Sequence, residues 1–172
     1  YDMAWYYRGL AYASKNNFDK AIEDSNEAIR LDPEDAYFWY SRGYALGKKG
    51  DSDKAIENYD EAIRLNPEYG MAWNNRACEL TRKGHFDRAI EDSCEAIRLA
   101  PESANAWDTR GFAYAQKGDH DKALEDYNEA IRLNPDDPLF WHNRGVSHQA
   151  LGNKAAAEAD LQKAKELGYS EE

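Results

Sequence analysis

The sequence predicts an all-α protein made of five similar helix hairpins. Two observations lead to this fold class. The phrase EAIR recurs at residues 27–30, 61–64, 95–98 and 129–132, each copy 34 residues after the last. Within each interval, apolar and small residues recur at helical spacing. Setting the frame at residue 2 gives a single array of five repeats: 2–35, 36–69, 70–103, 104–137 and 138–171.

The first predicted helix of each repeat has a tryptophan at its fourth position and a small residue at its eighth. The tryptophans are Trp5, Trp39, Trp73, Trp107 and Trp141, and the small residues are Gly9, Gly43, Ala77, Gly111 and Gly145. Positions 4, 8 and 11 share one helix face, so the small residue lets a second helix approach closely. A turn follows, in which glycine is suited to ending the helix: Gly50, Gly84, Gly118 and Gly152.

The second predicted helix begins after a polar residue that can cap it and ends before a proline. The capping candidates are Asn17, Asp51, Asp119 and Asn153. Alanines recur at positions 20 and 27 on the inner face, as in Ala21 and Ala28. An arginine lies in the last turn, where the helix dipole favours it: Arg30, Arg64, Arg98 and Arg132. In the first four repeats a proline then stops the helix, whereas the fifth repeat has Tyr169 at this position. Each repeat is predicted to be a helix–turn–helix hairpin.

The pattern W-x2-R-G-x2-Y, followed by A-x3-Y, A and P at a 34-residue period, resembles the tetratricopeptide repeat (TPR) family over the whole chain. The resemblance implies an α-solenoid of five antiparallel helix pairs in a right-handed superhelix. It also implies that the first helices line a concave surface that receives peptides or proteins. One departure from the family pattern is the seventh position, usually leucine, which is Arg8, Arg42, Arg76, Arg110 and Arg144.

These arginines should be partly buried, and a buried guanidinium needs an acceptor. Position 23 provides one in every repeat: Asp24, Asn58, Asp92, Asp126 and Asp160. We therefore expect a repeated tie between the two helices of each hairpin. The alternative is an arginine ladder that binds anionic ligands.

The last repeat differs on the face that would pack against a following repeat. Positions 21 and 28 are Ile or Leu in the first four repeats, but Glu158 and Lys165 in the fifth. Because the end of a solenoid needs a wettable face, we expect repeat 5 to act as a C-terminal cap. The first repeat has no such cap, and Tyr1 fits the last position of an earlier repeat. We expect the chain to be the C-terminal part of a longer protein or a trimmed piece of one.

Composition and motifs narrow the function. The net charge of −11 argues against nucleic-acid binding, and no run is apolar enough for a membrane helix. The two cysteines, Cys78 and Cys94, are too few for a disulfide scaffold and favour a reducing compartment, so we expect a cytoplasmic location. No catalytic, metal-binding or cofactor-binding motif is present, which predicts a non-enzymatic protein with no cofactor and no metal.

The candidate binding residues lie where repeats differ, on the first-helix face opposite the tryptophan. They are Tyr6, Tyr37, Tyr40, Tyr44, Lys48, Met71, Asn74, Asn75, Cys78, Arg82, Asn105, Asp108, Phe112 and His142. The four tyrosines are the rigid aromatic type enriched at binding hot spots, although they could instead line the surface between helices. Lys48, Arg82 and the two asparagines are expected to converge between repeats 2 and 3. No run of repeats carries the lysine and asparagine set with which TPR relatives clamp a C-terminal carboxylate.

Three functions remain as hypotheses. The first is a protein-interaction scaffold that binds an extended or helical peptide in its concave groove. The second is a homo-oligomerisation or assembly module whose exposed N-terminal face stacks on another chain. The third is a regulatory appendage of a larger enzyme.

Overall fold

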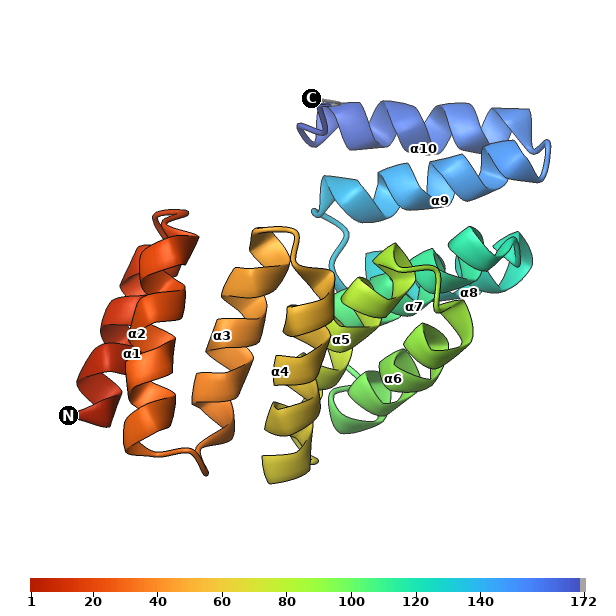
Figure 1. Cartoon of the computed structure of the whole chain (residues 1–172). Helices are drawn as coiled ribbons and strands as arrows, with labels where there is room; N and C mark the ends of the chain where they lie inside the picture. The colour runs from red at the N-terminus through yellow and green to blue at the C-terminus, as the bar shows by residue number, and fades with distance from the viewer. Residues whose placement is uncertain (171–172) are drawn as a thin grey trace. The chain divides into compact units, whose positions relative to one another are not determined.

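The protein is all-α, as the sequence predicts. A computed structural model describes residues 1–170, which form ten helices and no strand (Figure 1). The helices are α1 (Asp2–Ala13), α2 (Phe18–Leu31), α3 (Ala36–Lys48), α4 (Ser52–Leu65), α5 (Gly70–Arg82), α6 (Phe86–Leu99), α7 (Ala104–Lys117), α8 (His120–Leu133), α9 (Pro138–Ala150) and α10 (Lys154–Glu166). Each predicted repeat therefore contributes two helices at the expected places.

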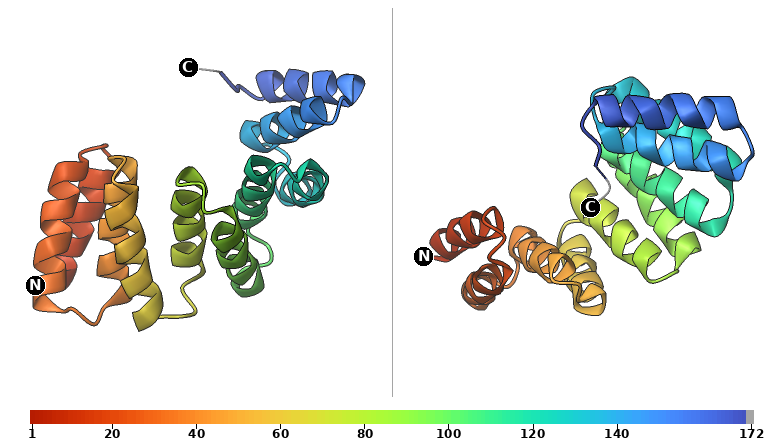
Figure 2. Two further views of the ribbon diagram at one scale, coloured as in Figure 1. Left: turned by 45° about the vertical axis from the view of Figure 1, so that its right-hand side comes forward. Right: turned by 90° about the horizontal axis from the view of Figure 1, so that it is seen from above.

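The helices divide into two compact units. The N-terminal unit, residues 1–83, holds α1 to α5, and the C-terminal unit, which begins at residue 84, holds α6 to α10. In the N-terminal unit α1 pairs with α2 and α3 with α4, and α5 packs on α4. In the C-terminal unit α7 pairs with α8 and α9 with α10, and α6 packs on α7 (Figure 2). Successive helices within each unit thus lie side by side.

The turns inside the hairpins follow the predicted chemistry, with one exception. Gly50 and Gly118 have φ angles of 86° and 93°, the left-handed region that glycine enters without strain. The side chains of Asn17, Asp51 and Asp119 each accept a hydrogen bond from the backbone N–H three residues later. The predicted cap at Asn153 is wrong: its side chain caps no N–H of α10, and its amide nitrogen lies 3.5 Å from Nδ1 of His148 instead.

The small residue at position 8 permits close helix packing. A Cβ placed on Gly43 would lie 2.9 Å from Cε1 of Tyr59, closer than real Cβ contacts allow. The isoleucine at position 28 then packs on the first helix of the next repeat, as Ile29 does against Phe38 and Ile131 against Phe140. These contacts confirm the predicted inner face and, at position 28, the predicted inter-repeat stripe.

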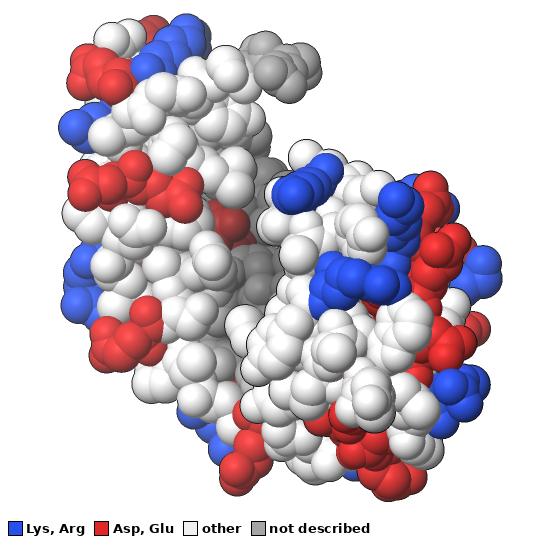
Figure 3. Space-filling view, turned by 90° about the vertical axis from the view of Figure 1, so that its left-hand side faces the viewer, with Lys and Arg blue, Asp and Glu red and all other residues white. Residues whose placement is uncertain are grey.

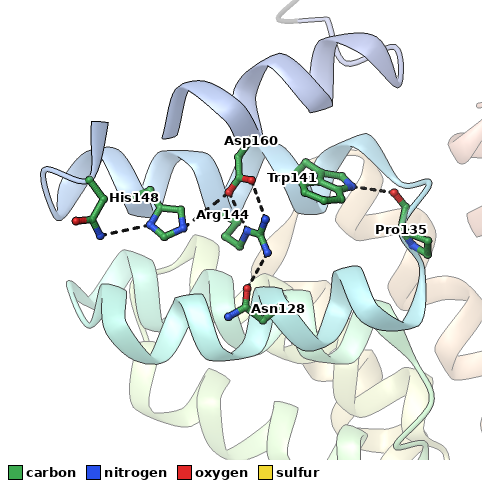
Figure 4. Close-up of polar contacts among 7 residues, drawn as sticks. Asn128, Pro135, Trp141, Arg144, His148 and Asp160 are labelled. Atoms are coloured by element: carbon green, nitrogen blue, oxygen red, sulfur yellow. Dashed lines mark hydrogen bonds and ion pairs between the residues drawn. The ribbon is translucent and has the colours of Figure 1, made fainter. Parts of the chain in front are cut away.

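The arginine at position 7 joins three helices rather than the two that were predicted. Arg144 makes two bonds to Asp160 of its own hairpin, at 2.7 and 2.8 Å (Figure 4). Its Nη1 donates a third bond, at 2.7 Å, to Asn128 of the preceding hairpin. The guanidinium also lies 4.9 Å from the ring centroid of Trp141, a cation–π geometry.

The predicted tie is confirmed in four repeats, through Arg8–Asp24, Arg42–Asn58, Arg110–Asp126 and Arg144–Asp160. The fifth pairing, Arg76 with Asp92, involves residues of different units and stays a prediction. Bidentate bonding to a carboxylate uses the guanidinium donors internally, which disfavours the arginine ladder for anionic ligands.

The tryptophan at position 4 forms a hydrogen bond with the linker between repeats. Sequence reasoning missed this role. The indole N–H of Trp141 donates a 2.8 Å bond to the carbonyl oxygen of Pro135 (Figure 4). Trp39, Trp73 and Trp107 make the same bond, at 2.9 Å, to the carbonyl of the proline six residues earlier. The tryptophan and the proline of the repeat pattern are therefore partners across each repeat boundary.

Candidate recognition surface

Apolar side chains at positions 2 and 9 of the first helices are exposed in both units. Positions 2, 5 and 9 lie on one face of a helix, three to four residues apart. In the N-terminal unit the exposed members are Met3, Leu10, Tyr37, Tyr44 and Met71, and in the C-terminal unit they are Phe112, Leu139 and Val146. Rows of exposed large apolar side chains are typical of interaction surfaces. We call the first-helix residues at these positions the recognition surface of each unit.

The recognition surface of the N-terminal unit contains a pocket of about 180 Å³ between α3, α4 and α5. Its walls are Tyr44, Gly47, Lys48, Tyr59, Asn75, Cys78, Glu79 and Arg82. The structure thus brings together Lys48, Asn75 and Arg82, which were expected to converge. Asn74 does not line this pocket, and its side-chain amide nitrogen lies 3.5 Å from Oδ1 of Asn75.

The two cations at this pocket differ in their partners. Arg82 donates from Nη1 to Oε2 of Glu79 at 2.6 Å, and Ser52 donates to the same oxygen at 2.7 Å. The Glu79 side chain is only 7% exposed, so Arg82 is held by a buried carboxylate. Lys48 lies with its ammonium 5.5 Å from the ring centroid of Tyr44, and it forms no ion pair with any residue between 1 and 170. Lys48 is therefore the cation available to a partner.

Sequence reasoning missed Glu79, although a signal for it was present. Glu79 occupies position 10 of its repeat, where the other repeats have Ala11, Ala45, Ala113 and Ser147. A charged residue at a position that is otherwise small indicates a local, repeat-specific arrangement.

The four tyrosines of the N-terminal unit fall into two groups. Tyr40 is half-buried, with its ring 4.8 Å from that of Tyr69 and its hydroxyl accepting a 3.0 Å bond from the side-chain amide of Asn75. Burial raises the pKa of Tyr40. Tyr6 is also half-buried, with its ring 5.4 Å from Phe38. These two line the surface between helices, whereas Tyr37 and Tyr44 are exposed and can meet a ligand.

The recognition surface of the C-terminal unit combines apolar and polar side chains, and its one acidic residue is Asp108. Asp108 is half-buried on α7, and its Oδ1 accepts a 2.9 Å bond from the side-chain amide of Asn143 on α9. Burial raises the pKa of Asp108 to about 7. Asn105 is exposed one turn earlier on α7. His142 stacks on Tyr169 with centroids 4.0 Å apart, beside a second pocket of about 380 Å³.

The described chain offers no metal centre of the usual kind. Residues 1–170 contain no group of three or more His, Cys, Asp or Glu side chains placed to hold a metal ion. None of the helices in that range has the length and apolar character needed to cross a bilayer.

Comparisons with known proteins match the repeat across most of the chain. Models of the tetratricopeptide repeat match residues 36–69, 58–91 and 139–167, and a TPR repeat model matches residues 9–50 and 111–152. No curated protein sequence is a significant match.

Solved structures resemble the chain in fold at low sequence identity. MamA from Desulfovibrio magneticus RS-1 superposes with a TM-score of 0.84 at 21% identity, over 96% of this chain and 94% of that chain. A thermophilic TPR protein from Thermus thermophilus gives 0.83 at 23% identity, over 98% and 92%. PilF from Pseudomonas aeruginosa gives 0.88 at 19% identity, over 99% and 78%.

Proposed function

The chain belongs to the tetratricopeptide repeat family, and we propose that it is a non-enzymatic scaffold that binds a segment of a protein partner on the recognition surfaces of its first helices. The observation that carries this proposal is the exposure of large apolar side chains at positions 2 and 9, next to a pocket in the N-terminal unit. The net charge of −11 supports a protein partner over nucleic acid. Cys78 and Cys94 form no disulfide within residues 1–170, which supports a cytoplasmic location.

In the N-terminal unit, we propose that an extended segment crosses repeats 1 to 3. Apolar residues of the partner would lie on Tyr37, Tyr44 and Met71, which are exposed. An acidic side chain or terminus would lie near Lys48, which no carboxylate of the described chain neutralises. Arg82 would contribute less, because Glu79 already holds it.

Two substitutions test this site with a peptide selected on the whole chain from a random phage-displayed library. Tyr44→Ala should weaken binding of that peptide by about 2 kcal/mol, as expected for an exposed aromatic hot spot. Lys48→Glu should weaken it in a salt-dependent way. Tyr40→Ala and Arg82→Glu are poor tests, since both residues have internal partners.

The matched controls are Leu31→Ala and Lys15→Glu, which change exposed residues outside the recognition surface. Fluorescence anisotropy at two salt concentrations measures all four variants. A selected peptide that tolerates both Tyr44→Ala and Lys48→Glu would show that the N-terminal unit binds elsewhere.

We also propose that the five repeats form one array that α10 closes. Glu158 and Lys165, at the positions where the other repeats have Ile or Leu, are both exposed on α10. Charged side chains on this face keep the end of the array wettable, which supports a capping role.

A second candidate function, assembly through the face of α1, rests on three side chains of that helix. The indole N–H of Trp5 makes no hydrogen bond within residues 1–170, whereas each of the other four tryptophans bonds a proline carbonyl. The Arg8 side chain is 54% exposed, against 19% for Arg110, and Tyr7 is 62% exposed. Viewed from the α1 side, the surface is largely uncharged around a few basic side chains, with acidic side chains along its lower edge (Figure 3).

Sedimentation velocity at several concentrations tests this second candidate. If two α1 faces associate, the wild type should shift to a dimer as concentration rises, and Tyr7→Glu should stay monomeric. Tyr37→Glu is the control, because it adds the same charge on the recognition surface. A wild type that is monomeric at every concentration would rule out self-assembly.

A further inference from the structure

Asp108 lacks the arginine that neutralises the buried aspartates at position 23 of the repeat. Asp24, Asp126 and Asp160 each bond an arginine at 2.7 Å. Asp108 accepts only the neutral amide of Asn143, and no Lys, Arg or His between residues 1 and 170 forms an ion pair with it.

The groups that face Asp108 within its unit do not supply the missing charge. On α8, the neighbouring titratable group is Tyr127, a neutral phenol that is fully buried. At the start of α9, Asp137 adds a like charge. On α7 itself, Arg110 bonds Asp126 and Cys94. His142 on α9 stacks on Tyr169. An ionised Asp108 therefore loses hydration without gaining an opposite charge.

The raised pKa of Asp108, about 7, has burial as its main cause and agrees with this geometry. A carboxylate held in such surroundings is stabilised most by a cation that replaces the lost water. A neutral donor offsets less of the free energy that the ionised carboxylate loses on leaving water, since the pKa of Asp108 stays raised despite the bond from Asn143.

Exposed side chains on either side of Asp108 define the rest of the ligand. Phe112 lies one turn further along α7 and is 41% exposed. Leu139 and Val146 are exposed on α9, which packs beside α8 and also contacts α7. A basic side chain that reaches Asp108 would thus be flanked by apolar neighbours.

The equivalent place in the N-terminal unit is neutral. Tyr40 and Asn75 are 35 residues apart and share a hydrogen bond, as Asp108 and Asn143 do. Position 5 is Tyr6, Tyr40 and Asn74 in the first three repeats, so the anion is specific to repeat 4.

We propose that Asp108 selects a lysine or arginine side chain, flanked by apolar residues, in the segment that the C-terminal unit binds; this rests on the proposed scaffold function. A cation on Asp108 favours the ionised carboxyl, so binding below pH 7 releases the proton that Asp108 carries. Affinity should therefore rise as pH rises toward 8 and fall about ten-fold at pH 6, one pH unit below the folded pKa of about 7.

The test selects peptides from a random phage-displayed library at pH 8 on three whole chains: the wild type, Asp108→Asn, and Asp121→Asn. Asn keeps the amide contact with Asn143 but cannot ionise. Asp121 is exposed in the first turn of α8, so its variant controls for the loss of one charge. Circular dichroism confirms that the three chains are equally helical.

The expected result is enrichment of one Lys or Arg beside apolar residues on the wild type and on Asp121→Asn, and no such enrichment on Asp108→Asn. A synthetic peptide from the wild-type pool should bind Asp108→Asn at least ten-fold more weakly, with no dependence on pH between 6 and 8. Equal enrichment of basic residues on Asp108→Asn would overturn the inference. Peptides that are apolar without a basic residue would also overturn it and leave the scaffold function intact, whereas no enriched peptide on any chain would overturn both.

Discussion

The carboxylate of Glu79 lies against the bare Cα of Gly47, in space that any other residue at position 47 would fill. A Cβ on Gly47 would lie 2.6 Å from Oε1 of Glu79, while Oε2 takes bonds from Ser52 and Arg82. The other repeats differ at both positions. They have Ala or Ser where repeat 3 has Glu79, and a residue with a side chain where repeat 2 has Gly47. Repeats 2 and 3 are therefore matched to each other at this contact.

The first prediction concerns this pair. Gly47→Ala should lower the free energy of unfolding by about 1–3 kcal/mol, because the added methyl group displaces the buried carboxylate of Glu79 from its bonds with Ser52 and Arg82. In a Glu79→Ala background the same change should be neutral or stabilising by up to about 1 kcal/mol, since alanine is the better helix former. Urea unfolding of the four chains in this cycle measures the coupling. Equal effects in both backgrounds would contradict the contact.

The second prediction concerns the arginine at position 7. Asp126→Ala should lower the free energy of unfolding by about 3 kcal/mol, because it leaves the largely buried guanidinium of Arg110 without its carboxylate. Adding Arg110→Leu should restore part of the loss by removing the unpaired cation, and leucine is what the family pattern has at this position. An unchanged midpoint in urea for Asp126→Ala would show that the tie does not contribute to stability.

A reciprocal variant tests the same tie from the other side. In repeat 2 the acceptor is Asn58, so Arg42 bonds only neutral amides, and burial lowers its pKa. Asn58→Asp gives Arg42 the carboxylate that the other repeats have, and it should stabilise the chain by about 1 kcal/mol. A thermal melt compares it with Glu57→Gln, which changes an exposed acid on the same helix.

The pH dependence of stability should report on Asp108. Its pKa is raised from 3.8 to about 7 by folding, so between these values the folded chain holds a proton that the unfolded chain has lost. The contribution of Asp108 to stability is therefore present below about pH 4 and is lost as pH rises through 7. The free energy of unfolding of Asp108→Asn, taken relative to that of the wild type, should therefore rise by the order of 1–2 kcal/mol between pH 4 and pH 8. A constant difference between the two chains across this range would contradict the raised pKa.

The capping role of α10 predicts that the chain will associate when this helix is made to resemble the other second helices. Glu158→Ile with Lys165→Ile restores the apolar stripe on an exposed face, so the variant should associate as concentration rises. Removal of residues 138–172 should destabilise and aggregate the remainder, because Ile131 loses its contact with Phe140. Light scattering measures both. A shortened chain that stays monomeric and equally stable would argue against the cap.

The sequence predicts the fold well because the repeat displays each structural position five times. A position that is Trp or small in all five repeats, or Pro in four of them, has one role, and the repeated copies separate this role from chance. The same averaging hides what occurs once. Glu79 occurs once and lies against Gly47, and Asp108 occurs once and has no cation beside it. The surroundings of both residues are set by other helices, and the spacing of residues along one helix does not reveal them. The burial of Tyr40, in contrast to Tyr44, likewise results from contacts with Tyr69 and Asn75.

The bond from each position-7 arginine to the preceding hairpin has an acceptor that varies along the chain. The acceptors are Asn26, Asp60, Cys94 and Asn128, and the contact with the sulfur of Cys94 is 3.4 Å long, against 2.6 to 2.8 Å for the others. Sulfur is a weak acceptor, so little hydrogen-bond energy is lost when α6 and α7 separate at this point. Transient opening of a repeat array begins where neighbouring hairpins hold each other least. Breathing of the C-terminal unit should therefore start between α6 and α7, and the amide hydrogens there should exchange with solvent ahead of those between α8 and α9.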